Sequence, residues 1–231
     1  MFHKLAVLCK NQHTSSRSDI PMSIIIYHIT RIILSLFRRT MDFLWHQHAI
    51  GYCKTSHCQL GSNIRFKGRA LLKFHKSSKI TIGDSFICNS GFYHSIDNGI
   101  CSKICVGPDA ELVIGNNSGI SNSCILCHSK IVIGNYVNIG AGTMIFDSNF
   151  HSTDWKMRED RQKDILHSDK APVFIGNHVF IGANSLICKG VTIGDKSMIA
   201  AGSVVICNIP EGEIWGGNPA KFIKKASTHK N

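Results

Sequence analysis

The sequence predicts an all-β fold, a parallel β-helix of six-residue repeats preceded by an N-terminal helical segment. In the second half of the 231-residue chain, aliphatic residues recur at every sixth position, and glycine directly follows several of them. Basic residues are concentrated at the front, where residues 1–80 hold 13 Lys and Arg against 2 Asp and Glu, while residues 81–231 hold 13 of each. The chain therefore divides into a basic front segment and an electrically balanced repeat domain.

Composition excludes several classes of protein. The chain is 43% hydrophobic and 18% charged, which is typical of one globular domain and not of a disordered chain or a coiled coil. A mean hydropathy of +0.02 is too low for a polytopic membrane protein. The formal net charge is +11, but the basic segment has few aromatic residues and no recognised nucleic-acid motif. We therefore expect no nucleic-acid partner.

The front of the chain is expected to form two pieces. Residues 1–21 are predicted to be a disordered extension, or to precede a true start at Met22. Residues 22–50 are predicted to form an amphipathic basic helix, because apolar residues recur there at three- and four-residue steps. These residues are Ile25, Ile29, Ile32, Ile33, Leu36, Phe37 and Leu44. The apolar run is too short and polar to cross a bilayer, so residues 22–45 are expected either to pack on the body or a neighbouring subunit, or to contact a membrane surface.

The repeat is defined by a ladder of aliphatic residues. Its clearest members are Ile175, Ile181, Ile187, Ile193, Ile199 and Val205. A helix with 3.6 residues per turn would spread these positions around its axis. Three six-residue sides closing a triangular turn would instead stack each aliphatic residue on the one eighteen positions away. The same frame occurs at Ile133, Ile139 and Ile145, so residues 51–215 are predicted to form the β-helix.

Two segments depart from the repeat frame. Residues 151–172 are rich in charged side chains and are predicted to be an excursion loop leaving one corner of the β-helix. Loops displayed on a rigid scaffold are where functional residues gather. Residues 216–231 are predicted to form a basic C-terminal tail.

The ten cysteines do not form a recognisable metal motif. Cys124 and Cys127 have CxxC spacing, but no second CxxC and no histidine pair completes a zinc site. On a β-helix wall the two side chains would point to different sides. We therefore expect reduced thiols in a cytoplasmic protein and no metal requirement.

The second half of the chain resembles a known family. Residues 171–225, together with the run FDSNFHSTDW at residues 146–155, resemble the hexapeptide-repeat acetyltransferases, which include galactoside, maltose and serine acetyltransferases and the capsule or exopolysaccharide O-acetyltransferases. The resemblance covers about residues 80–225. It implies a left-handed coil, a homotrimer with active sites between subunits, and acetyl-CoA as cosubstrate.

His151 is the predicted catalytic base. The ladder of isoleucines at six-residue steps up to Ile145 predicts an aliphatic residue at 151, where an imidazole stands instead, and departures from a local pattern gather at functional sites. The resemblance places the family's catalytic histidine at this position. Asp147 and Asp154 are the two candidates for holding the second ring nitrogen, and either could be a turn residue. By motif position, Asn122 resembles an asparagine that touches the acceptor sugar, and Asp154 is also placed near the substrate.

The resemblance also places the coenzyme A site. Its pantetheine arm would lie along backbone at Gly182, Ala183, Ala200 and Ala201, where small residues permit close approach. Basic residues near its phosphates would be Lys221, Lys224 and Lys225. One departure from some relatives is the Ile206-Cys207 pair after the last repeat turn, which leaves one adenine-side contact unmatched.

The resulting functional hypothesis is an O-acetyltransferase. It would move an acetyl group from acetyl-CoA to a hydroxyl of a saccharide, with a surface polysaccharide or its precursor as the leading acceptor class, in the cytoplasm or at the inner face of the membrane. His151 would act as general base for direct attack on the thioester. Two other classes stay open: a zinc lyase resembling the γ-type carbonic anhydrases, although His128, His151 and His167 lack a matching spacing, and a non-catalytic repeat scaffold. A serine acetyltransferase would need a long helical front domain, and a sugar-nucleotide pyrophosphorylase a nucleotide-binding domain.

Overall fold

The computed structural model describes residues 21–91 and 101–227. The prediction of a disordered extension therefore lies outside the described residues, apart from Pro21. The chain forms two compact units, residues 1–40 and residues 41–231. The second unit contains the β-helix and every residue expected at the functional site.

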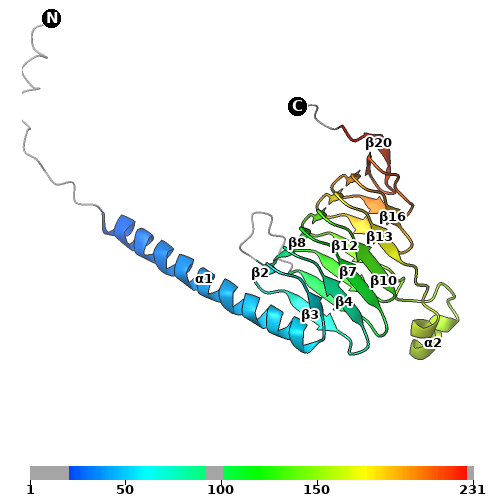
Figure 1. The fold of residues 1–231 in the computed structure, drawn as a ribbon, viewed down its shortest axis with the longest axis horizontal. Coiled ribbons are helices and arrows are strands. Elements are labelled where there is room, and N and C mark those ends of the chain that lie inside the picture. Colours follow the sequence, from blue (N-terminus) through cyan, green and yellow to red (C-terminus); the bar gives the residue numbers. More distant parts are fainter. Residues whose placement is uncertain (1–20, 92–100, 228–231) are drawn as a thin grey trace, which may run out of the picture. The chain divides into compact units, whose positions relative to one another are not determined.

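Three sheets, parallel except for one pair of strands at the C-terminal end, form the walls of the β-helix (Figure 1). The first sheet contains β1 (Gln59–Leu60), β4 (Lys79–Ile82), β7 (Glu111–Ile114), β10 (Lys130–Ile133), β13 (Val173–Ile175) and β16 (Thr192–Ile193). The second contains β2 (Arg65–Lys67), β5 (Ile87–Asn89), β8 (Gly119–Ser121), β11 (Asn138–Ile139), β14 (Phe180–Ile181), β17 (Met198–Ile199), β19 (Glu213–Gly216) and β20 (Lys221–Lys225). The third contains β3 (Leu71–Phe74), β6 (Lys103–Val106), β9 (Cys124–Cys127), β12 (Met144–Phe146), β15 (Leu186–Ile187) and β18 (Val204–Val205). The predicted parallel β-helix is confirmed.

The aliphatic ladder fills the interior of the coil. Ile175 pairs with Ile193 across β13 and β16, and Ile181 pairs with Ile199 across β14 and β17. Each of these pairs spans eighteen residues, as the triangular turn requires. All four side chains are at most 2% exposed, and burying each one stabilises the fold by about 1.5–3 kcal/mol relative to leaving it in water.

One corner of the β-helix is held by a ladder of side-chain amides and carboxylates. Asn177 Oδ1 accepts hydrogen bonds from the backbone N–H and the side-chain amide of Asn135, each at 2.9 Å. In the next coil, Asp195 Oδ1 accepts from the Asn177 N–H at 2.7 Å. The residues that follow, Tyr136 and His178, both adopt left-handed backbone angles, and their rings stack with centroids 4.8 Å apart. The side-chain oxygens of the ladder therefore accept backbone N–H groups at the turns, which would otherwise lack a hydrogen-bond acceptor.

Replacing Asn177 with alanine is expected to lower the free energy of unfolding by about 1–3 kcal/mol, because the Asn135 N–H loses its partner in a part-buried turn. Denaturant unfolding followed by circular dichroism measures this change. As a control, Asn138→Ala removes an exposed amide in β11 and is expected to shift stability by no more than about 0.5 kcal/mol. Equal free energies of unfolding for the two variants would contradict the claim that the hydrogen bonds of this ladder stabilise the fold.

The first coil is capped by the end of the long helix α1 (Met22–Thr55). Ala49 and Cys53 join the buried core, and Tyr52 Oη accepts a hydrogen bond from the Phe74 N–H at 2.9 Å. His46 Nδ1 accepts from the Phe66 N–H at 3.3 Å. The helix therefore ends at Thr55, five residues beyond its predicted end at residue 50. Its last turns stay helical because Tyr52 and Cys53 pack on the first coil and cover the end of the hydrophobic core.

Two further segments differ from the expected loop and tail. The excursion loop contains a short 3-10 helix, η1 (Met157–Glu159), and a helix, α2 (Arg161–Leu166). The segment predicted as a basic tail contains β20, which pairs antiparallel with β19. Among the residues that the structure describes, no helix combines the length and apolarity needed to cross a bilayer.

Candidate active site

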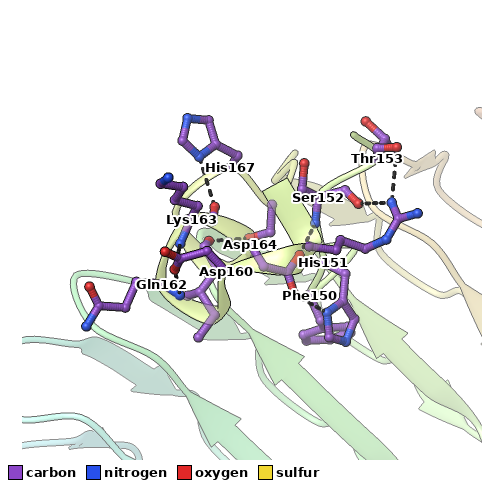
Figure 2. A network of polar contacts seen from close by, with 12 residues as sticks. Phe150, His151, Ser152, Thr153, Asp160, Gln162, Lys163, Asp164 and His167 are labelled. Atoms are coloured by element: carbon purple, nitrogen blue, oxygen red, sulfur yellow. Dashed lines mark hydrogen bonds and ion pairs between the residues drawn. The ribbon is translucent and has the colours of Figure 1, made fainter. Parts of the chain in front are cut away.

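His151 is hydrogen-bonded to a carboxylate of α2. Its Nδ1 lies 2.7 Å from Asp164 Oδ2. Figure 2 draws the two residues within a network of polar contacts of the loop. The imidazole is 71% exposed, whereas the Asp164 side chain is 10% exposed. The pair therefore anchors one ring nitrogen inside the loop and leaves the rest of the ring open to an incoming molecule.

The Asp164 carboxylate is held from both sides. Its Oδ1 accepts a hydrogen bond from the Ser152 N–H at 2.7 Å. The hydrogen bond from His151, and then that from Ser152, hold the pKa of Asp164 below its usual value. An ionised Asp164 favours the tautomer with the proton on Nδ1 of His151, so that Nε2 carries the lone pair.

The loop around this pair is ordered by its own hydrogen bonds. Asp160 caps α2 by accepting from the N–H groups of Gln162 and Lys163 at 2.8 and 3.2 Å. Arg158 Nη1 donates to the carbonyl oxygens of Ser152 and Thr153 at 2.7 and 3.1 Å. The Asp160 bonds thus cap α2, and the Arg158 bonds tie η1 to the residues after His151, so the loop around the base is ordered, as a precisely placed base requires.

The expectation that Asp147 or Asp154 holds the imidazole is corrected. Asp147 is fully buried, and its two oxygens accept the backbone N–H groups of His128 and Ser129, each at 2.7 Å. Asp147 follows the inward–outward alternation of β12 and points to the interior, so its carboxylate braces the turn after β9. Asp154 Oδ1 accepts the Lys156 N–H at 2.9 Å in a local turn of the loop.

Asn122 also has a structural position. It is 1% exposed, has a left-handed backbone φ of 42°, and its Oδ1 accepts the Gly91 N–H at 2.9 Å. The structure therefore gives this amide a role in the turn, and contact of Asn122 with an acceptor sugar stays a prediction. The motif position alone does not reveal this, because a turn asparagine and a sugar-binding asparagine occupy the same register.

The positions expected to bind coenzyme A form a column along one corner. Ala183 follows β14 and Ala201 follows β17, and the carbonyl oxygen of Ala183 accepts the Gly202 N–H at 2.8 Å. Within the described residues, the backbone N–H groups of Ala183 and Ala201 have no hydrogen-bond partner. The corner therefore offers two amide donors one coil apart.

Gly182 and Ala200, which precede these alanines, take part in the stacking of the coils. A Cβ on Gly182 would come within 2.5 Å of the Ala201 nitrogen, so only glycine fits there. The carbonyl oxygen of Ala200 accepts the Ser203 hydroxyl at 2.6 Å. The three predicted phosphate-binding lysines, Lys221, Lys224 and Lys225, are exposed on β20.

A groove that the sequence did not reveal lies beside His128. It has a volume of about 430 Å³ and is lined by Lys73, Phe74, His75, Cys105, Val106, Gly107, Pro108 and His128. The His128 ring packs edge-on against Phe150, with centroids 5.2 Å apart, and Phe150 directly precedes His151. Burial lowers the pKa of His128, which favours its neutral form.

Cys127 lies under the same turn and is not activated. Burial and the Asp147 carboxylate raise its pKa to about 12, and its thiol donates to Asp147 Oδ2 at 3.5 Å. A protonated buried thiol is a poor nucleophile. Within the described residues of this one chain, no group of three His, Cys, Asp or Glu side chains is arranged to hold a metal ion.

A family model and several curated proteins match this chain. Residues 172–207 match the model described as the hexapeptide repeat of succinyl-transferase. A putative acetyltransferase of Saccharomyces cerevisiae is 38% identical over 50% of this chain and 57% of its own length. A chloramphenicol acetyltransferase of Klebsiella aerogenes is 29% identical over 71% of this chain and 75% of its own length. A mitochondrial γ-carbonic anhydrase of Arabidopsis thaliana is 31% identical over 52% of this chain and 47% of its own length. The chain thus spans only about half the length of two of these relatives.

Solved structures share the fold. A hexapeptide-repeat acetyltransferase of Vibrio cholerae, solved with acetyl coenzyme A, superposes with a TM-score of 0.51 at 24% identity, over 83% of this chain and 86% of that chain. A mutant of an N-acyltransferase of Bacillus cereus, solved with dTDP and coenzyme A, gives a TM-score of 0.55 at 19% identity, over 74% and 84%. These likenesses confirm the left-handed β-helix expected from the sequence.

Proposed function

Because the chain belongs to the hexapeptide-repeat acetyltransferase family, we propose that it transfers an acetyl group from acetyl-CoA to a hydroxyl of a saccharide. The observation that carries this proposal is the His151–Asp164 pair at 2.7 Å, in an ordered loop whose preceding residue, Phe150, packs against His128 of the groove. A surface polysaccharide or its precursor is the proposed acceptor class, and the cytoplasm, where acetyl-CoA is made and used, is the proposed location. Contact of residues 22–45 with a membrane would bring the enzyme to acceptors carried on lipids.

The proposed mechanism uses direct attack without an acyl-enzyme. Asp164 holds the proton on Nδ1 of His151, and Nε2 removes the proton from the acceptor hydroxyl as its oxygen attacks the thioester carbonyl. The carbon–sulfur bond then breaks, and the protonated His151 returns the proton to the departing thiolate. The sugar gains an ester and coenzyme A leaves as a free thiol. No nucleophilic side chain is needed, because the thioester is already activated.

The acceptor is proposed to occupy the groove next to His128. Phe74, Val106 and Pro108 offer apolar surface to a sugar ring, while Lys73 and His75 offer polar and charged groups at the rim. A neutral His128 can either donate or accept a hydrogen bond. A solved N-acyltransferase with this fold binds the nucleotide dTDP, so a nucleotide-linked sugar is included among the acceptors to be tested.

Coenzyme A is proposed to lie along the Ala183–Ala201 corner, with its phosphates near β20. The N–H groups of Ala183 and Ala201 would donate to the amide carbonyls of the pantetheine arm. Gly182 and Ala200 would allow its close approach. Lys221, Lys224 and Lys225 would supply the positive charge that a polyanionic cosubstrate requires.

Replacing Lys224 and Lys225 together with alanine is expected to raise the KM for acetyl-CoA about tenfold and to leave kcat nearly unchanged. The removed charges contact phosphates remote from the reacting carbonyl, so they stabilise the bound substrate and the transition state alike. Steady-state kinetics with varied acetyl-CoA measures both constants. Lys79→Ala, at another exposed lysine, serves as control and should behave as the unaltered enzyme. A tenfold fall in kcat at constant KM would contradict this placement.

A homotrimer with sites between subunits remains part of the proposal. Large apolar side chains are exposed on the sheet faces of the β-helix: Met144, Phe174, Phe180 and Met198, at 37–47% exposure. Of these, Phe180 and Met198 are register partners in the second sheet, and exposed apolar neighbours of this kind are typical of a surface that another chain covers. A neighbouring subunit would close the groove on its open side.

The proposed function is tested by incubating the purified protein with acetyl-CoA and a panel of saccharides, including nucleotide-linked sugars, and measuring free thiol release. We expect acceptor-dependent release with at least one saccharide. A zinc lyase is the second candidate, because a γ-carbonic anhydrase is 31% identical over 143 residues. Stoichiometric zinc with CO₂ hydration and no thiol release would favour the lyase, and no turnover of either kind would favour a repeat scaffold.

A further inference from the structure

The first half of helix α1 carries an apolar surface that acyl transfer does not use. We call it the α1 apolar face: Ile25, Ile29, Ile32, Ile33, Leu36 and Phe37. Their spacing places all six within one side of the helix, and each is between 41% and 60% exposed. So many exposed large apolar residues in one stripe indicate a surface made to be covered.

All the formally charged residues of the same segment are cationic. Arg31, Arg38 and Arg39 lie on the opposite side of the helix and at its border, and no acidic residue occurs between Met22 and Met41. His28, Arg31 and Arg39 line one shallow groove together with Ile32 and Leu36. Apolar and cationic side chains are therefore presented next to each other.

We propose that residues 22–40 of α1 adsorb in the plane of an anionic lipid surface. The α1 apolar face would enter the boundary between headgroups and acyl chains, and the long arginine side chains would reach the phosphates beside it. Arg31 lies in the middle of the segment, and an arginine at the centre of a bilayer is costly, so the helix would lie along the surface. This inference does not depend on acyl transfer.

A second copy of the same segment fits this surface less well. It would supply apolar side chains, but it would also bring three further arginines and no carboxylate to neutralise them. An anionic bilayer satisfies both sides of the helix at once, because its interface is apolar below and negatively charged above.

The test is co-sedimentation of the full-length protein with vesicles. We expect binding to vesicles of phosphatidylcholine mixed with phosphatidylglycerol, weaker binding as salt is raised, and little binding to phosphatidylcholine alone. Replacing Arg31, Arg38 and Arg39 with glutamine should lower the partition coefficient about 100-fold. Replacing Lys76, Lys79 and Lys163, which are also exposed, with glutamine is the matched control and should leave it unchanged. Equal binding to both kinds of vesicle, or to neither, would overturn the proposal.

A second variant separates the membrane from a second copy. Replacing Ile29, Ile33 and Leu36 with glutamine keeps helix-forming residues in place and should abolish vesicle binding. The oligomeric mass in the absence of lipid, measured by analytical ultracentrifugation, should stay the same. A lower mass would mean that another copy covers the α1 apolar face, and unchanged vesicle binding would mean that the face does not enter the membrane. Either result would overturn the proposal.

Discussion

Replacing His151 with alanine is expected to lower kcat by about two or more orders of magnitude, because the acceptor hydroxyl loses the group that removes its proton. The KM for acetyl-CoA should change little, since the proposed cosubstrate contacts lie at Ala183, Ala201 and β20. The side chain is 71% exposed, so the variant should fold normally. Thiol release at saturating acetyl-CoA and acceptor measures the effect.

The matched control for this variant is His167→Ala. His167 is an exposed histidine of the same excursion loop, and its Nδ1 lies 2.9 Å from the Lys163 carbonyl oxygen at the end of α2. Its removal should leave kcat within about twofold, because it touches neither His151 nor Asp164 in the proposed reaction. A well-folded His151→Ala enzyme that keeps its kcat would refute the assignment of the base.

Replacing Asp164 with asparagine is expected to lower kcat by at least about 100-fold. The asparagine oxygen can still accept the Ser152 N–H, so its NH₂ group would face Nδ1 of His151. A donor at that place favours the tautomer with the proton on Nε2, which cannot act as a base. Nitrogen NMR shifts of the His151 ring would report the change of tautomer, a readout that a purely structural role of Asp164 would not alter.

Variants of Asp154 and Asp147, the two other carboxylates near His151 in the sequence, test whether Asp164 is the one that orients its ring. Asp154→Asn should preserve kcat, because Asp154 only caps a local turn. Asp147→Asn should lower the free energy of unfolding rather than kcat. The backbone N–H groups of His128 and Ser129 each donate to one oxygen of Asp147, and an asparagine has only one side-chain oxygen to accept them. If Asp154→Asn, and not Asp164→Asn, abolished turnover, the orienting role of Asp164 would be wrong.

The lowered pKa of Asp164 also gives the sign of a pH effect. A carboxyl group with a lower pKa in the folded than in the unfolded chain stabilises the fold above its unfolded pKa of about 4 and loses this contribution as the pH falls through the folded value. The loop should therefore stay anchored at neutral pH and loosen only in acid.

The sequence could predict those parts of the molecule that follow from a period. The six-residue register of Ile175, Ile181 and their neighbours predicts a triangular coil, because three six-residue sides stack each aliphatic residue on the one eighteen positions away. The break in that register at residue 151 pointed to the residue that the structure pairs with Asp164. Both inferences rest on the spacing of residues within the repeat, which can be read directly from the sequence.

The remaining features are contacts between residues that the six-residue repeat does not relate to each other. Asp164 lies thirteen residues after His151 and reaches it only because α2 turns this first-turn carboxylate back to the segment that carries the histidine. The loop holds several acidic residues, and their spacing in the sequence does not show which of them the folded loop brings to His151. The ladder through Asn135 and Asn177, and the coverage of the first coil by Tyr52, likewise join residues of different turns, which sequence spacing alone does not identify.

The central claim is that the β-helix places the His151–Asp164 pair at the thioester of a bound acyl-CoA. A crystal structure of the full-length protein with coenzyme A tests it most directly. We expect the sulfur of coenzyme A about 3–4 Å from Nε2 of His151, with the pantetheine arm along Ala183 and Ala201 and the Nδ1–Asp164 contact retained. Coenzyme A bound with its sulfur remote from His151 of every subunit would contradict the claim.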